Sequence, residues 1–246
     1  MIRCITFDWG DTLVANWGMP YLATERRVFA RLHAELTALG HPPPAGWAEQ
    51  CIAELQAEWQ RTADPASNPE QEEMDFRALM RRWLAAAGAD PDAGPVRAAA
   101  DRAFDRMTDT VMPYADAAPA LASLHRRYRI GIVSHVPWPG DACRRWFVRH
   151  GLAPFVDFYS LSCDVGRIKP HPAHYADAIR QAGCAPHEIL HVGDHPVRDI
   201  AGGRACGLRV CLRRTERIYP EAQLDACAPD AEILHLSEIA EIAARL

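Results

Sequence analysis

Residues 189–194 read Ile-Leu-His-Val-Gly-Asp, a short apolar run that ends in a glycine and a carboxylate. Residues 2–8, Ile-Arg-Cys-Ile-Thr-Phe-Asp, and residues 129–134, Arg-Ile-Gly-Ile-Val-Ser, have the same design. Short runs of apolar and β-branched residues that stop at a turn residue are typical of buried strands. We therefore predict a buried strand in each of the three stretches, closed by a polar side chain.

Helical segments alternate with strands along the second half of the chain. The predicted elements there are, in order, a helix at 117–127, a strand at 129–134, a strand at 155–161, a helix at 172–182, a strand at 189–193, a helix from about Pro196 and a strand at 209–212. This order predicts an α/β fold with a parallel, doubly wound sheet and right-handed crossovers. Ligands of such sheets bind outside the carboxyl ends of the strands. We therefore expect Asp8, Ser134 and Asp194 to line one crevice.

Residues 19 to 112 show helical periodicity only. Apolar side chains recur there every three or four positions, and the pattern predicts four amphipathic helices, at 28–39, 52–59, 76–87 and 96–107. Four such helices are enough to pack on one another as a separate bundle. We predict an α/β core domain made of residues 1–15 and 113–246, with an all-α helical cap domain inserted at 16–112.

The composition limits the class of protein. The chain has 246 residues, of which 49% are hydrophobic and 24% charged, and its formal net charge is −5. This balance excludes a mainly disordered chain, and a mildly acidic protein is a poor general binder of nucleic acid. No apolar stretch approaches the ~20 residues of a membrane span, and the first residues lack a signal-peptide layout. We expect a globular, cytoplasmic protein with neither nucleic-acid nor membrane partners.

Three aspartates lie at or near the predicted strand ends: Asp8, Asp194 and Asp199. Carboxylates that converge repel one another, so such a cluster needs either raised pKa values or a cation. Oxygen-rich sites suit Mg²⁺, which binds one or two carboxylates beside a substrate phosphate. Each aspartate alone is equally well explained as a turn or helix-capping residue. The three together, in this order with Ser134 and Lys169, favour a magnesium and phosphate site.

The order of these residues resembles one known family. The haloacid dehalogenase-like hydrolase superfamily has motifs similar to Asp8-x-x-x-Thr12, Ser134, Lys169-Pro170 and Gly193-Asp194-x-x-x-x-Asp199. The likeness spans the whole chain, because some members carry a helical cap between the first and second motifs. The resemblance implies that Asp8 is a nucleophile and forms an aspartyl-phosphate.

The resemblance also implies a metal site and exposes a departure from the family pattern. Mg²⁺ would be held by the Asp8 carboxylate, the Gly10 carbonyl and Asp194, with Asp199 behind them or bridging through water.

Family phosphatases usually carry a general acid two residues after the nucleophile, where this chain has Gly10. General acid–base catalysis typically contributes 10²–10⁴-fold. Asp11 is the candidate replacement, because a turn that Gly10 permits would direct its side chain inward.

Three further residues receive phosphate-handling roles from the same resemblance. Thr12 would fix the turn of the first motif, Ser134 would bind the phosphoryl group, and Lys169 would neutralise charge between nucleophile and phosphate. Lys169 is the only lysine among 27 basic residues, and an ammonium on a flexible stem reaches between two oxyanions where a planar guanidinium fits differently. His135 is a candidate substrate contact, although a hydrogen-bonded loop histidine is the commoner interpretation.

These residues support three functional hypotheses. The leading one is a Mg²⁺-dependent phosphatase that acts on a small phosphomonoester, a phosphorylated metabolite. A second is a binding module with weak or no turnover, which Gly10 favours and the intact Asp8, Lys169 and Asp194 oppose. A third is a metal-independent 2-haloacid dehalogenase, which is less favoured because a metal site has no use in that chemistry. The substrate and the oligomeric state stay open.

Overall fold

The computed structural model describes residues 1–16, 18 and 21–246, and its contacts divide the chain into two compact units. The α/β unit consists of Met1–Trp17, Val111–Val136 and Phe147–Leu246, and the helical unit consists of Gly18–Thr110 and Pro137–Trp146. The sequence predicts that residues 137–146 belong to the α/β domain. In the structure this segment belongs to the helical unit, because Trp138 packs against the helical core and Arg145 forms an ion pair with Asp105 at 2.5 Å.

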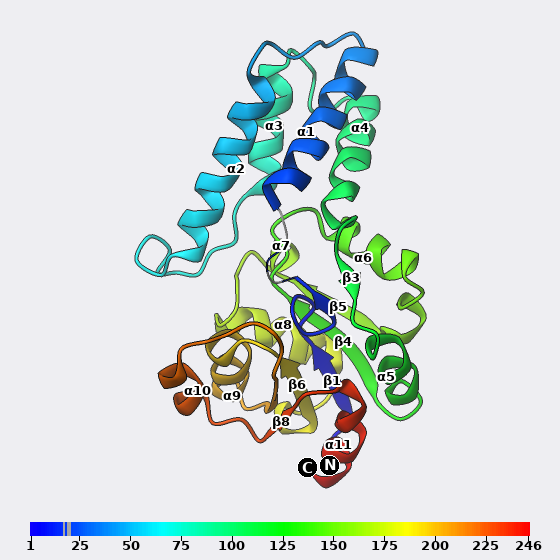
Figure 1. Cartoon of the computed structure of the whole chain (residues 1–246), viewed down its shortest axis with the longest axis vertical. Coiled ribbons are helices and arrows are strands. Elements are labelled where there is room, and N and C mark those ends of the chain that lie inside the picture. Colours follow the sequence, from blue (N-terminus) through cyan, green and yellow to red (C-terminus); the bar gives the residue numbers. More distant parts are fainter. Residues whose placement is uncertain (17, 19–20) are drawn as a thin grey trace. The chain divides into compact units, whose positions relative to one another are not determined.

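A six-stranded sheet forms the centre of the α/β unit (Figure 1). Its strand order is β5-β4-β1-β6-β7-β8, and every neighbouring pair is parallel. The strands are β1 (Cys4–Phe7), β4 (Arg129–Ser134), β5 (Phe158–Leu161), β6 (Ile189–Gly193), β7 (Arg209–Arg213) and β8 (Ala231–Ile233). Residues of β1, β4 and β6 are buried almost throughout, as in strands covered on both faces. The predicted α/β fold with a parallel sheet is confirmed.

Helices connect these strands. They are α5 (Ala117–Leu124), α6 (Gly140–Arg149), α7 (Ser162–Val165), α8 (Pro172–Ala182), α9 (Gly202–Ala205), α10 (Glu221–Cys227) and α11 (Ile239–Arg245). Helix α8 has the predicted bounds, because Pro172 suits its first turn and Gly183 ends it in the left-handed conformation. A π-helical turn, Pro196–Ala201, leads from β6 into α9 where the sequence predicted the start of an ordinary helix.

The register of the central strands decides where their ends lie. Strand β1 lies between β4 and β6, and Phe7 pairs with both Ile132 and Val192. The carboxyl ends of three strands therefore meet at one edge of the sheet. This edge is where parallel α/β sheets bind ligands.

The helical unit contains α1 (Tyr21–Ala38), α2 (Trp47–Ala63), α3 (Phe76–Ala86) and α4 (Gly94–Phe104). All four predicted helices are present, and three of them begin earlier than predicted. Aromatic rings fill the core, where Phe29 lies edge-on to Trp83 at 5.2 Å and to Phe104 at 5.6 Å between ring centroids. Edge-on pairs of this kind stabilise a core beyond the area that they bury. Across the described ranges, no helix has both the length and the apolarity that a bilayer span needs.

A short ribbon was not predicted from the sequence. Strand β2 (Val14–Ala15) pairs antiparallel with β3 (Met112–Pro113), next in sequence to two of the four points where the chain passes between the units. Two residues are too few to produce a periodic pattern, so only the folded chain reveals this pairing.

Candidate active site

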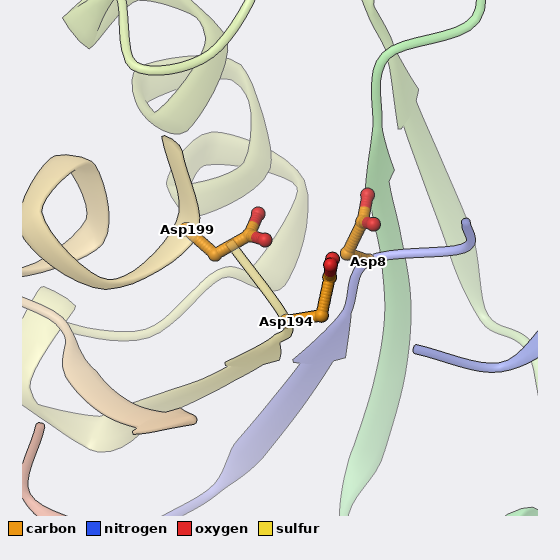
Figure 2. A group of neighbouring side chains, drawn as sticks. All are labelled: Asp8, Asp194 and Asp199. Carbon is orange, nitrogen blue, oxygen red and sulfur yellow. The ribbon is translucent and has the colours of Figure 1, made fainter. Parts of the chain in front are cut away.

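Three carboxylates meet at the carboxyl edge of the sheet (Figure 2). Asp8 follows β1, Asp194 follows β6, and Asp199 lies in the π-helical turn. One oxygen of each lies within 4.8 Å of the others, and all three side chains are almost fully buried. Gly193 permits this approach, because a Cβ at that position would lie 2.3 Å from Cγ of Asp199. The structure thus brings together the three aspartates that the sequence singled out.

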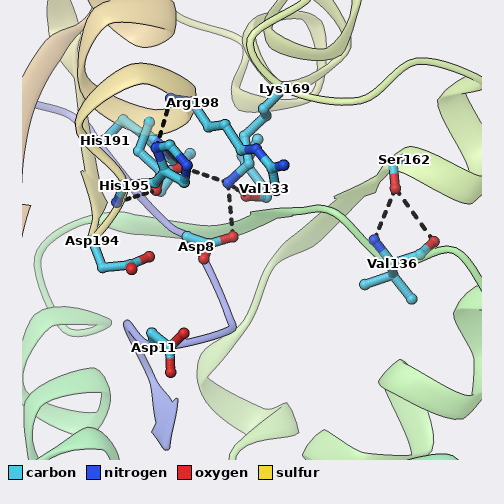
Figure 3. Close-up of polar contacts among 12 residues, drawn as sticks. Asp8, Asp11, Val133, Val136, Ser162, Lys169, His191, Asp194, His195 and Arg198 are labelled. Atoms are coloured by element: carbon cyan, nitrogen blue, oxygen red, sulfur yellow. Dashed lines mark hydrogen bonds and ion pairs between the residues drawn. The ribbon is translucent and has the colours of Figure 1, made fainter. Parts of the chain in front are cut away.

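Lys169 lies among these carboxylates (Figure 3). Its Nζ donates hydrogen bonds to Asp8 Oδ1 at 2.7 Å, to Asp199 Oδ1 at 2.5 Å and to the Val133 carbonyl at 2.9 Å. These three acceptors use the three donors of an ammonium group. Burial disfavours the charge, but Asp199 and Asp8 outweigh burial and raise the pKa of Lys169. The side chain is therefore a cation at neutral pH.

The three aspartates differ in their affinity for a proton. Burial disfavours charge on Asp199, yet Lys169 and His191 outweigh burial and hold its pKa below the usual value. Burial raises the pKa of Asp8 in spite of Lys169. Burial, together with the charges of Asp199 and Asp8, raises the pKa of Asp194 well above the usual value. A divalent cation at this edge would favour the charged form of Asp8 and Asp194.

His191 supports the cluster from inside the sheet and was not predicted as a site residue. Its Nε2 lies 3.3 Å from Asp199 Oδ1, and its Nδ1 lies 2.9 Å from the Thr6 hydroxyl oxygen. A carboxylate only accepts, so Nε2 carries the proton and Nδ1 accepts from Thr6. Thr6 and His191 are register partners on β1 and β6. A histidine within the otherwise apolar stretch 189–193 was the sequence signal that points to this role.

The loop after Asp8 differs from the expected turn. The left-handed residue is Asp11, with φ 54°, and not Gly10. Asp11 is 2% exposed, its Oδ1 accepts a hydrogen bond from the Asn16 N–H at 2.9 Å, and its Oδ2 lies 3.3 Å from Arg217 Nη1. The Asp11 carboxylate is therefore buried and joins its own loop to the 214–220 loop, and its role as a general acid stays a prediction. The atoms nearest to a Cβ at Gly10 would all belong to the Asn16 side chain, with Nδ2 at 3.3 Å and Cβ at 3.8 Å.

The remaining predicted residues lie at the ends of β1 and β4. Ser134 is buried, and a hydrogen bond from its hydroxyl favours the charged form of Asp8. His135 follows it and is half-buried. The buried Thr12 hydroxyl has no hydrogen-bond partner among the described residues, whereas its carbonyl accepts from Arg213 Nη1 at 2.6 Å. Thr12 thus holds the turn through its backbone and not through its side chain.

The loop at 214–220, after β7, supplies a second set of contacts that the sequence did not predict. The Tyr219 hydroxyl donates a hydrogen bond to Asp194 Oδ2. Arg217 Nη1 lies 3.8 Å from the same Asp194 oxygen, in addition to its contact with Asp11. The Arg217 guanidinium lies 4.9 Å from the centroid of the Tyr219 ring, and the His195 ring lies 4.8 Å from it. No motif marks this loop, so only its folded position reveals the contacts.

Comparison with known proteins identifies the family. The model of haloacid dehalogenase-like hydrolases matches residues 2–207. The chain belongs to the haloacid dehalogenase-like hydrolase family. This hydrolase is 29% identical to a glyceraldehyde 3-phosphate phosphatase of Methanopyrus kandleri, over 100% of this chain and 99% of the relative. It is 31% identical to a phosphoserine phosphatase of Thermus thermophilus, over 96% of this chain and 99% of the relative.

Solved structures similar to this hydrolase include both chemistries of the family. A 2-haloacid dehalogenase from Pseudomonas syringae is 26% identical with a TM-score of 0.65, over 100% of this chain and 99% of that chain. A phosphatase of the family from Thermococcus onnurineus is 20% identical with a TM-score of 0.63, over 98% and 97%. The second likeness concerns the fold alone. The choice between phosphate and haloacid chemistry therefore depends on the site.

The donor set of this hydrolase fits a hard divalent cation. Asp8 and Asp194 offer carboxylate oxygens at one edge of the sheet, and Mg²⁺ prefers such ligands. Both oxygens of Asp199 already accept hydrogen bonds from the protein: Oδ1 from Lys169, and Oδ2 from the His195 N–H at 2.9 Å. These hydrogen bonds favour a role in which Asp199 supports the metal ligands and does not bind the metal directly.

Proposed function

We propose that this hydrolase is a Mg²⁺-dependent phosphatase that acts on a small phosphorylated metabolite of the cytoplasm. The observation that carries the proposal is the buried Lys169 between Asp8 and Asp199, with Asp194 beside them and its pKa raised by burial and by its acidic neighbours. Two phosphatases among the full-length relatives support the reaction class. The helical unit would be the cap domain of the enzyme.

The proposed metal ligands are the Asp8 carboxylate, the Gly10 carbonyl and Asp194, with Asp199 linked through water. When bound, Mg²⁺ supplies positive charge to the phosphoryl oxygens and relieves the repulsion among the carboxylates. Asp199 contributes by holding Lys169, and His191 in turn holds Asp199.

The proposed reaction has two displacements at phosphorus. One carboxylate oxygen of Asp8 attacks the phosphorus atom, and the bond between phosphorus and the alcohol oxygen breaks. Lys169 neutralises charge on the nucleophile and on the phosphoryl group, Ser134 donates to a phosphoryl oxygen, and His135 contacts the substrate. Water then attacks the aspartyl-phosphate, the bond from phosphorus to Asp8 breaks, and inorganic phosphate leaves.

The departing alcohol needs a proton donor, a general acid, in this reaction. Gly10 offers no side chain, and Asp11 is held by Asn16 and Arg217. Asp11 acts as the acid in this proposal only after Arg217 releases it. We therefore expect slow turnover of esters whose alcohols are poor leaving groups, since these depend most on general acid catalysis.

A metal-independent 2-haloacid dehalogenase is the second candidate. The 26% identical dehalogenase and the glycine at position 10 favour it, because displacement of a halide needs no proton donor. The position of Asp194 favours phosphate chemistry instead, because its carboxylate oxygen lies within 4.8 Å of those of Asp8 and Asp199, and a cation stabilises carboxylates that converge in this way.

The test is phosphate release from a panel of small phosphomonoesters, with Mg²⁺ and with EDTA. We expect turnover that needs the metal and falls at least about 1,000-fold in Asp8→Asn, which removes the nucleophile. Asp101→Asn, at an exposed position of α4, is the matched control and keeps the wild-type rate. Chloride release from a 2-chloro acid in EDTA would replace the proposal by the dehalogenase. Mg²⁺ binding without any turnover would replace it by the binding module.

A further inference from the structure

The Tyr219 hydroxyl bonds directly to a carboxylate of the proposed metal site. It donates to Asp194 Oδ2, while Asp8 and Asp199 are bonded to Lys169 on the other side of the cluster. Asp194 is 3% exposed, so water has little access to it as an alternative donor. None of the four motifs at Asp8, Ser134, Lys169 and Gly193 contains or adjoins Tyr219.

The Tyr219 ring is held in place by two neighbours. The His195 ring lies 4.8 Å away, and the Arg217 guanidinium lies 4.9 Å from the ring centroid. A cation near an aromatic face and a packed second ring both restrict rotation of the side chain. The hydroxyl of a tyrosine is a hydrogen-bond donor at neutral pH, and Asp194 Oδ2 is its acceptor.

We propose that Tyr219 is a positioning residue for Mg²⁺, whose hydroxyl fixes the Asp194 carboxylate in the orientation that binds the metal. The proposal rests on the proposed function, which makes Asp194 a metal ligand. A carboxylate has two oxygens with two lone pairs each, so donation to Oδ2 leaves Oδ1 able to coordinate. Hydrogen bonds to metal ligands orient them, and their loss typically costs 10–100-fold in metal affinity.

The opposite role is also testable. If the hydroxyl competed with the metal for Asp194, removing it would free an oxygen and strengthen Mg²⁺ binding. Positioning and competition therefore predict changes of opposite sign in the same measurement. We favour positioning, because the two packed neighbours of the ring fix the hydroxyl at one oxygen.

The variant Tyr219→Phe isolates the hydroxyl, because the phenyl ring keeps its contacts with His195 and Arg217. Tyr114→Phe is the matched control. The Tyr114 hydroxyl donates to Glu216 Oε2 at 3.1 Å, so this variant removes a tyrosine hydroxyl that contacts the same 214–220 loop but none of the three aspartates. Denaturant unfolding curves of both variants without metal check that each folds.

Calorimetric titration of the full chain with MgCl₂ measures the dissociation constant without substrate. We expect Tyr219→Phe to raise that constant about tenfold, and Tyr114→Phe to leave it unchanged. In turnover assays the Mg²⁺ concentration for half activation would rise by the same factor, while KM for the phosphoester at saturating Mg²⁺ stays constant. Equal or tighter Mg²⁺ binding by Tyr219→Phe would overturn the positioning role alone. A wild-type chain that binds no Mg²⁺ would overturn the metal site itself, and the role of Tyr219 with it.

Discussion

The carboxylate cluster is contacted by a cation on each of two sides, and the two contacts differ in burial. The Lys169 side chain is 2% exposed and bonds to Asp8 and Asp199 at hydrogen-bond distance. The Arg217 side chain is 27% exposed and lies 3.3 Å from Asp11 and 3.8 Å from Asp194. Water hydrates part of the Arg217 guanidinium and weakens its longer contacts, whereas it does not reach the Lys169 ammonium. Similar ion pairs around one site are therefore unequal in energy.

The largest expected effect is on stability, when each of the two cations is replaced by methionine. Lys169→Met leaves two buried carboxylates without their cation, and breaking such a pair costs about 3–5 kcal/mol in the free energy of unfolding. Arg217→Met removes a partly exposed cation, and its partners keep other donors, the Asn16 N–H on Asp11 and the Tyr219 hydroxyl on Asp194, so we expect a smaller loss, of about 1 kcal/mol. Urea unfolding of both variants without metal measures the two losses.

Activity separates the same two variants. Loss of a group that neutralises transition-state charge typically costs about 100- to 1,000-fold, so Lys169→Met should lower kcat by that factor. Arg217→Met should change kcat by less than about tenfold. Equal effects of the two variants on stability and on kcat would contradict the comparison.

Acid pH should lower the stability of the segment that follows Lys169 in the sequence, helix α8. His174 in α8 is fully buried, its Nε2 donates to the Ser160 carbonyl at 3.0 Å, and burial lowers its pKa to about 4. The unfolded chain, in which histidine titrates near ~6.5, therefore binds more protons than the folded chain between these two values. The resulting stability is fully present above about pH 6.5 and is lost as the pH falls toward 4, by about 3 kcal/mol.

Glutamine at this position keeps an N–H donor but does not titrate. We expect the unfolding free energy of His174→Gln to fall less steeply than that of the wild type between about pH 6.5 and 4, by urea titration at each pH. His187→Gln, at an exposed position, should follow the wild-type curve. Parallel curves for wild type and His174→Gln would show that other groups cause the acid sensitivity.

The smallest expected effect is a gain of activity from a substitution at Gly10, the neighbour of the Arg217 partner Asp11. Gly10 does not have a positive φ, and the atoms nearest to a Cβ there belong to the Asn16 side chain, at 3.3–3.8 Å. Gly10→Asp should therefore fold and restore a general acid, raising kcat for an alkyl phosphate about tenfold, below the typical range for this contribution because the position is not optimised.

A matched series tests the chemical origin of that gain. Gly10→Asn has the same size without the acid and should show no gain. A nitrophenyl phosphate, whose leaving group needs little protonation, should gain less from Gly10→Asp than an alkyl phosphate. An equal gain with Asn, or on both substrates, would show that position 10 acts by shape and not by proton transfer.

Much of the fold could be predicted because its signals are local. The apolar strand at 129–134 and the helix at 172–182, bounded by proline and glycine, have the predicted bounds. The two-residue strands β2 and β3 gave no local signal, because they exist only through each other. Helix α6 was missed although Cys143, Trp146 and Phe147 have helical spacing, and its first turns belong to the helical unit.

The meeting of Asp8, Ser134 and Asp194 follows from the amino-acid sequence, because residues that end neighbouring parallel strands share one edge of a sheet. The pairing of each oxygen with its donor depends instead on the folded chain. Folding placed Lys169 between Asp8 and Asp199, turned Asp11 toward Arg217, and brought Tyr219 onto Asp194. These partners are 25 or more positions apart in the sequence, so they meet only when the whole unit packs. No local sequence pattern encodes a contact over such a separation.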